Sequence, residues 1–291
     1  MSQEPPVEQI RACPSCGASP MGRYCNRCGE KRRDNHDFSI RHYLSEAIET
    51  FTHFDSKILR TAWRLIAHPG ALSADYLEGR RIRYVNPLRL FLLFSVLYYF
   101  SNSIFPYNAF TTPLATQLHQ NDYYHSFAAS QVATAMHGMG MDYPAFERAY
   151  NEKTATLSKT LLFALIPVIA LLLYVFLFRK KRYYSEHLVV ATHFWSFALI
   201  IIGIFIPPLL LVLVRLGAAL GVPASVMTAD SVPTLIIQAV FALYLFAMLL
   251  RVYRVSYWYS GLVAVVFAWS FFQIVWLFRF LLFVATLVSL G

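Results

Sequence analysis

Residues 69–105 read PGALSADYLEGRRIRYVNPLRLFLLFSVLYYFSNSIF and carry the chain from a charged segment into a long apolar run. Pro69-Gly70 predicts a turn, and Gly79 is expected to end a short helix over Ala71–Glu78 in the left-handed conformation that suits glycine. Asn86-Pro87 predicts the start of the next helix, because a proline in the first turn sacrifices no hydrogen bond. The stretch therefore predicts a hinge between a chain that lies along a membrane surface and one that crosses the membrane.

Downstream of this hinge, the chain consists mostly of apolar runs. Overall, 57% of the residues are hydrophobic and 14% are charged, whereas soluble domains average about 45–50% and about 25%. Five runs approach the roughly 20 apolar residues that a membrane-spanning helix needs: 88–105, 157–178, 188–214, 234–250 and 261–290. We predict an all-α membrane protein with about five transmembrane helices, the last being either one tilted helix or a helix with an interfacial piece.

Basic residues are concentrated beside these runs. With an odd number of spans, three groups fall on one face: Arg80, Arg81, Arg83 and Arg89; Arg179, Lys180, Lys181 and Arg182; Arg251 and Arg254. The positive-inside rule then places the N-terminus in the cytoplasm and the C-terminus outside, with an external loop over 106–156. Tyrosine and tryptophan beside the same groups predict an inner aromatic belt: Tyr183, Tyr184, Tyr253, Tyr257, Trp258 and Tyr259.

The net charge of +9 is typical of nucleic-acid-binding proteins, but its position beside apolar runs is what membrane orientation produces. Nucleic acid is therefore not expected as a partner, and a bilayer with anionic headgroups is. The first residues contain no apolar signal-peptide core, so the N-terminal part is expected to stay in the cytoplasm.

All four cysteines lie in the segment CPSCGASPMGRYCNRC, as Cys13, Cys16, Cys25 and Cys28. Two C-x-x-C pairs, each followed by glycine, predict a zinc ribbon in which four thiolates close a tetrahedral, structural Zn²⁺ site. Disulfides, a rubredoxin-like iron site and a metal-free segment are the alternatives, and a cytoplasmic location argues against disulfides. Folding of this short module is expected to depend on the metal.

A third segment joins the ribbon to the hinge. From Ile40 to Ile66, apolar residues recur at helical spacing with charged residues opposite, which predicts an amphipathic helix over 39–67. Its apolar face packs either on the inner membrane surface or against the transmembrane helices, and the sequence leaves both open. The predicted organisation is a ribbon with a flexible N-terminus (1–36), a membrane-adjacent helical segment (37–86) and a transmembrane domain (87–291).

Together, the ribbon, the amphipathic segment and the PG…YLEG.R..Y.NP motif resemble a family of bacterial integral membrane proteins of unknown function. The resemblance covers residues 10–105, and the matching positions are Pro69, Gly70, Tyr76, Gly79, Arg80, Arg81, Tyr84, Asn86 and Pro87. It implies a bacterial inner-membrane location and brings no known activity.

Two groups of residues are candidates for binding or function. Arg80, Arg81, Arg83, Tyr84 and Asn86 either contact anionic lipid or a ligand or only set topology and shape the hinge. His193, Gln238, Gln273 and Arg279 are polar residues inside predicted spans, where such groups are often functional. For His193 the alternative is an interhelical hydrogen bond, and for Arg279 it is snorkelling to headgroups.

No catalytic residue can be assigned, because the sequence contains no GxSxG, HExxH, P-loop or Rossmann motif. The leading hypothesis is a non-enzymatic membrane scaffold, sensor or partner-recruiting protein with an unknown protein partner. A transporter or lipid-handling protein is the alternative, suggested by Pro167 and Pro207-Pro208 in the spans. An enzyme that acts on a lipid-linked substrate is a further alternative. The oligomeric state stays open.

Overall fold

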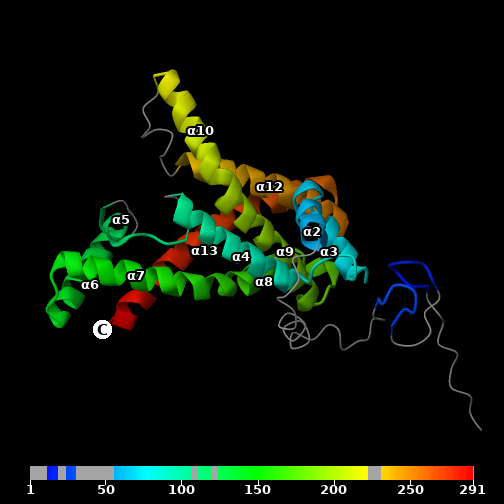
Figure 1. The fold of residues 1–291 in the computed structure, drawn as a ribbon, viewed down its shortest axis with the longest axis horizontal. Coiled ribbons are helices and arrows are strands. Elements are labelled where there is room, and N and C mark those ends of the chain that lie inside the picture. Colours follow the sequence, from blue (N-terminus) through cyan, green and yellow to red (C-terminus); the bar gives the residue numbers. More distant parts are fainter. Residues whose placement is uncertain are drawn as a thin grey trace, which may run out of the picture.

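The computed structural model describes residues 12–18, 24–30, 56–105, 110–119, 124–221 and 231–290. Within these ranges the chain forms helices and turns, and no strand (Figure 1). Four helical stretches are long and apolar enough to cross a membrane: Tyr143–Phe176, Tyr184–Ala219, Val232–Tyr253 and Tyr257–Leu290. The predicted fold class, an all-α membrane protein, is confirmed.

The hinge region folds largely as the sequence indicates. Helices α2 (Ser56–Ala67) and α3 (Ala71–Leu77) are followed by α4 (Pro87–Ile104). The Gly79 N–H donates to the Tyr76 carbonyl and the Arg80 N–H to the Asp75 carbonyl, which is the Schellman arrangement around a left-handed glycine, here with φ 92°. At the start of α4, the Asn86 side chain accepts from the Leu88 N–H at 3.0 Å.

The first predicted span forms a helix, but it is not among the four long apolar stretches. Helix α4 has 18 residues, about 27 Å at 1.5 Å per residue, against a hydrocarbon core of about 30 Å. Its last turn is also polar, with Ser101, Asn102 and Ser103. That this run crosses the membrane therefore stays a prediction.

The segment 106–156, predicted as an external loop between two spans, is mostly helical where the structure describes it. It contains α5 (Leu114–His119), α6 (His125–Met139) and α7 (Tyr143–Leu161). Pro113 directly precedes α5, and Pro144 lies in the first turn of α7, so both prolines start helices rather than interrupt them. These helices share a second small core with the last turns of α13 (Tyr257–Leu290).

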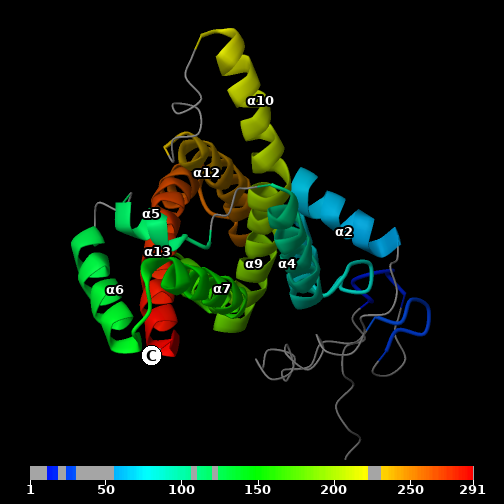
Figure 2. The same cartoon turned by 60° about the vertical axis from the view of Figure 1, so that its left-hand side comes forward.

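The second span is longer than predicted, because α7 continues through a 3₁₀ turn (Leu162–Ala164) into α8 (Leu165–Phe176). The last span is one helix of 34 residues, about 51 Å long, which answers the question left open by the sequence. Both stretches exceed the hydrocarbon thickness, and their far ends build the second core (Figure 2).

The third span is the centre of the bundle. Helix α9 (Tyr184–Ile200) is buried on all sides from His187 onward. It passes into a π-helical turn (Ile201–Phe205) and then α10 (Ile206–Ala219). The π-helical turn directly precedes α10, whose first turn contains Pro207-Pro208, and α10 projects away from the other helices (Figures 1 and 2). Helix α12 (Ser231–Tyr253) returns the chain to the bundle.

The three predicted basic groups lie at one end of the bundle. The Lys180 Nζ donates to the Arg254 carbonyl at 3.2 Å and the Arg182 guanidinium to the Val252 carbonyl at 2.8 Å. The Arg251 guanidinium donates to the carbonyl of Pro69 at 2.6 Å. The α8–α9 turn, the α12–α13 turn and the hinge region therefore share this end.

The described part of the predicted amphipathic helix, α2, packs against the bundle. Leu65 is buried, and its carbonyl accepts a hydrogen bond from the Tyr244 hydroxyl of α12 at 3.0 Å. On another side of α2, Leu59 and Trp63 are exposed. Residues 39–55 of the predicted helix lie outside the described residues.

Candidate metal centre and hinge

The four cysteines converge as two similar knuckles. Their sulfurs all lie within 4.8 Å of one another. In each knuckle the glycine N–H donates to the first cysteine carbonyl, Gly17 to Cys13 at 2.8 Å and Gly29 to Cys25 at 2.7 Å. Both glycines have φ near 75°, which an L side chain would strain. The spacing and the two glycines predicted this geometry.

The donor set fits a metal ion. Amide groups of Arg27 and Cys28 lower the pKa of Cys25 to about 7. For Cys28, the Glu30 amide acts in the lowering direction, but burial and the three neighbouring sulfurs raise its pKa to about 12. Four thiolates this close repel one another, so a cation at their centre is needed to stabilise the fully ionised set. These residues could hold one metal ion with no position left for a substrate.

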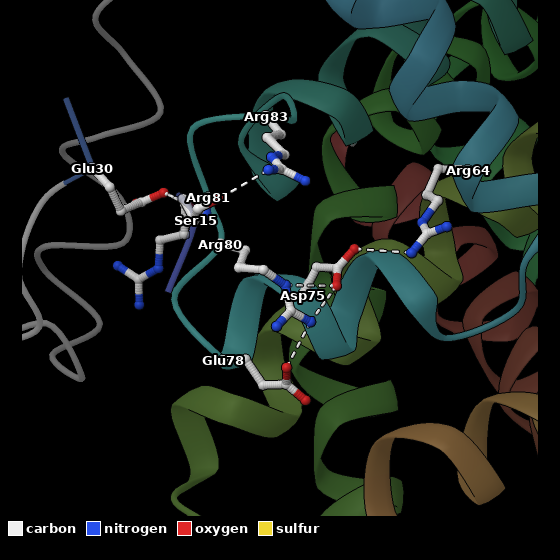
Figure 3. Close-up of polar contacts among 8 residues, drawn as sticks. All are labelled: Ser15, Glu30, Arg64, Asp75, Glu78, Arg80, Arg81 and Arg83. Atoms are coloured by element: carbon white, nitrogen blue, oxygen red, sulfur yellow. Dashed lines mark hydrogen bonds and ion pairs between the residues drawn. The ribbon is translucent and has the colours of Figure 1, made fainter. Parts of the chain in front are cut away.

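The ribbon contacts the hinge through Glu30, the second residue after the last cysteine (Figure 3). One oxygen of this buried carboxylate accepts from the Ser15 hydroxyl at 2.5 Å and from the Arg81 and Ile82 backbone N–H groups at 3.2 and 3.1 Å. The Arg83 guanidinium donates to the Ser15 carbonyl at 2.8 Å. Both knuckles are thereby tied to the segment that leads into α4.

A second charge cluster joins α3 to α2 and to the residues that directly follow α3 (Figure 3). The Asp75 carboxylate, 11% exposed, pairs with Arg80 at 2.5 Å and with Arg64 of α2 at 3.2 Å. Arg80 also pairs with Glu78 at 2.6 Å. The hydrogen bond that Arg80 donates to Asp75, together with the charge of Asp75, raises the pKa of Arg80, opposed in part by burial. The cluster fixes the turn between α3 and the hinge.

The other hinge residues proposed as lipid or ligand contacts also have internal contacts. The Arg81 guanidinium lies 4.6 Å over the Tyr76 ring, and Asn86 caps α4. Burial, followed by the charge of Asp75, raises the pKa of Tyr84. The arrangement therefore favours the alternative in which this motif shapes the hinge.

The polar residues predicted inside the spans do not form one site. His193 is 1% exposed, and its Nδ1 lies 2.9 Å from the Ser73 hydroxyl of α3, which is the interhelical hydrogen bond weighed as its alternative. Gln238 is half-buried and Gln273 is exposed on the side of α13. Arg279 lies over the Trp276 ring at 5.8 Å.

Sequence reasoning missed Glu30, Ser73, Asp75 and His187. His187 stacks on Tyr253, and its Nδ1 lies 2.9 Å from the Tyr253 hydroxyl. Glu30 and Asp75 could have been noticed in the sequence, because Glu30 follows a knuckle glycine and Asp75 lies close to the basic motif. A carboxylate at either place is expected to have hydrogen-bond donors around it. Ser73 and His187 have partners far away in the sequence, so no sequence pattern indicated them.

Comparison with known proteins finds a match that covers the hinge region. Residues 55–99 match the model of a protein family of unknown function, DUF3667. The match covers α2, α3, the Asp75 cluster and most of α4, and it stops short of the ribbon. No curated protein and no solved structure matches the chain.

Proposed function

We propose that the protein is a non-enzymatic membrane scaffold or sensor, in which a zinc-loaded ribbon is coupled to the start of α4 and presents its outer face to a protein partner. The Glu30 junction carries this proposal, because one carboxylate joins the ribbon to two hinge amides. A four-thiolate site offers no open coordination position, so the metal would serve structure rather than catalysis.

In this proposal the metal determines whether the hinge is held. A ribbon this short cannot build a sufficient hydrophobic core, so its two knuckles depend on the metal. Loss of the metal would release Glu30, and the Arg81 and Ile82 amides would then lose their acceptor. The state of the ribbon would thus reach the first residues of α4 through a few hydrogen bonds.

The outer face of the ribbon is the surface we assign to a partner. Tyr24, Asn26 and Arg27 are exposed there, and tyrosine and arginine are enriched in protein interfaces. We place the ribbon on the cytoplasmic side of the membrane, following the distribution of basic residues, and the spans in a bacterial inner membrane, following the family resemblance of residues 10–105.

Hydrogen exchange of the hinge tests the coupling in the full-length protein in micelles. The Arg81 and Ile82 amides are expected to be protected with Zn²⁺ bound and to exchange faster after chelation. Glu30→Ala should lose the protection while metal content stays at one ion per chain, and the neighbouring Glu78→Ala is the control that should keep it. Equal exchange with and without metal would refute the coupling.

Crosslinking tests the recruiting role. A photoreactive residue at Tyr24, introduced in cells, is expected to form an adduct with one discrete protein, and Cys28→Ser should abolish it. The same residue at Phe127, an exposed position in α6, is the control. Identical adducts from both positions, or adducts unaffected by Cys28→Ser, would contradict the role.

Transport or lipid handling is the second candidate, favoured by the π-helical turn Ile201–Phe205 beside Pro207-Pro208. Such turns occur frequently at functional sites, and here the Ser101 hydroxyl of α4 donates to the Gly203 carbonyl. Reconstituted vesicles would show lipid or solute flux that falls in His193→Ala and Arg279→Ala. Flux that is absent, or unchanged in both variants, would exclude this candidate.

A further inference from the structure

Two turns at the basic end of the bundle are joined to each other. We call them the clasped turns: residues 177–183 between α8 and α9, and residues 251–256, which comprise the end of α12 and its link to α13. Lys180 and Arg182 of the first turn donate to the Arg254 and Val252 carbonyls of the second at 3.2 and 2.8 Å. These bonds bring together basic residues that lie about 70 positions apart in the sequence.

The clasped turns concentrate positive charge. They carry Arg179, Lys180, Lys181, Arg182, Arg251 and Arg254, and all except Arg182 are exposed. The neighbouring carboxylate, Glu186, is already used, since it pairs with Arg182 at 3.4 Å and accepts from the Tyr183 N–H at 3.2 Å. Within the described ranges, the surface therefore presents several cations that form no ion pair with an acidic group.

The backbone of each turn gives an independent indication. Lys181 has φ 48° and Arg254 has φ 49°, and within the described ranges these are the non-glycine residues with positive φ. Glycine adopts this conformation without strain, whereas a long side chain does not. A cation at both positions indicates that the side chains have a role that outweighs the conformational cost.

Exposed aromatic rings place the clasped turns at the depth of lipid headgroups. Phe178 and Tyr183 are 60% and 67% exposed in the first turn, and Tyr257 and Trp258 are 73% and 92% exposed just after the second. Tyrosine and tryptophan concentrate at membrane–water interfaces because one part of each ring is apolar and another is polar. The apolar sides of the spans continue directly from these rings.

We infer that the clasped turns bind the phosphate-bearing headgroup of an anionic phospholipid. Cations with flanking aromatic rings at the end of spanning helices match such a headgroup in charge and in depth. The sequence had suggested the hinge arginines for this role, but Arg80 is ion-paired and Arg83 contacts the ribbon. This inference does not depend on the metal or on the proposed coupling to the hinge.

Native mass spectrometry of the full-length protein tests the inference by counting bound lipid. Dioleoyl phosphatidylglycerol is expected to bind more tightly than dioleoyl phosphatidylcholine. The double variant Lys181→Gly/Arg254→Gly should weaken phosphatidylglycerol binding roughly thirtyfold, the effect of two cations near an anionic surface. Its thermal stability should stay the same or rise, because glycine suits both backbone positions.

Two comparisons make the result decisive. Lys181→Gln/Arg254→Gln removes the charges but keeps the side chains, and it should weaken binding equally. Arg148→Gln/Lys153→Gln removes two cations from α7 and should leave binding unchanged. The inference is overturned if the glycine variant retains the lipid, if the α7 variant loses as much, if phosphatidylcholine binds equally well, or if inorganic phosphate displaces the lipid at millimolar concentration.

Discussion

Gly70 is the position where the hinge region depends most directly on the absence of a side chain. It lies between α2 and α3 with φ 74°. A Cβ built there would lie 2.8 Å from the Met248 Cα and 3.1 Å from the Met248 carbonyl oxygen of α12. Gly70→Ala therefore combines a strained backbone with a clash against backbone atoms, which cannot move aside as a flexible side chain could.

Two other glycines separate these effects. Gly140 has φ 63° and open space around its Cβ position, whereas Gly203 has an ordinary φ and a Cβ position 2.8 Å from the Tyr98 ring. Left-handed backbone costs an L residue about 1–2 kcal/mol, and overpacking costs about 1–3 kcal/mol. We expect Gly140→Ala to lower the free energy of unfolding by about 1–2 kcal/mol. For Gly203→Ala the loss of about 1–3 kcal/mol is reduced by the roughly 0.5–1 kcal/mol that alanine gains over glycine in a helix. Gly70→Ala combines both costs and should lose roughly 2–5 kcal/mol.

Unfolding in mixed SDS and dodecylmaltoside micelles, followed by tryptophan fluorescence, measures these differences. Trp195 reports the core, since it is fully buried in α9. The reasoning is refuted if Gly70→Ala is no less stable than Gly140→Ala, because the close approach of α12 to the α2–α3 turn would then be absent.

Four further predictions follow from the ribbon and hinge. Metal analysis of the purified protein should give one divalent ion per chain, and Cys28→Ser should lower that content and loosen the ribbon. Asn86→Ala should cost about 1 kcal/mol of unfolding free energy through loss of the α4 cap. Asp75→Asn should cost about 1–3 kcal/mol, because it leaves Arg64 and Arg80 without their shared carboxylate; Glu78→Gln, at a side chain 46% exposed, should change stability by less than about 0.5 kcal/mol. Burial raises the pKa of Tyr84, so the folded state favours the neutral phenol. The stability that this neutral phenol contributes is present below pH ~10 and is lost as the pH rises further. The Tyr84→Phe variant should therefore lose less stability than the wild type when the pH is raised from about 9 to about 11.

Features that depend on neighbouring residues could be predicted from the sequence. The knuckle glycines, the left-handed Gly79 and the Asn86 cap each follow from the chemistry of two to five consecutive residues. The apolar runs likewise predicted the long helices, because lipid requires each segment to satisfy its own backbone hydrogen bonds. Within 106–156, Pro113 precedes α5 and Pro144 lies in the first turn of α7, because proline is compatible with the start of a helix.

Features that depend on residues far apart in the sequence could not be predicted from it. Glu30 meets Arg81 and Ile82 across about 50 positions, and Ser73 meets His193 across 120. Periodicity along the chain cannot show such pairs, because it specifies which face of a helix is apolar but not which polar group lies opposite. The same limit applies to Arg83, which suggested lipid binding in the sequence, because its partner Ser15 lies 68 positions away.

Two independent physical arguments lead us to expect the basic end of the bundle on the cytoplasmic side of the membrane. The ribbon contacts Arg81 and Ile82 in the hinge, and the preceding turn contacts the clasped turns through Arg251 and Pro69. A four-cysteine metal site needs reduced thiols, which a cytoplasmic compartment maintains. The clasped turns carry the excess of lysine and arginine that orientation rules assign to the cytoplasmic face. Because the structure connects these two features, we expect one side to satisfy both, with the headgroup site and the metal-controlled hinge facing the same leaflet.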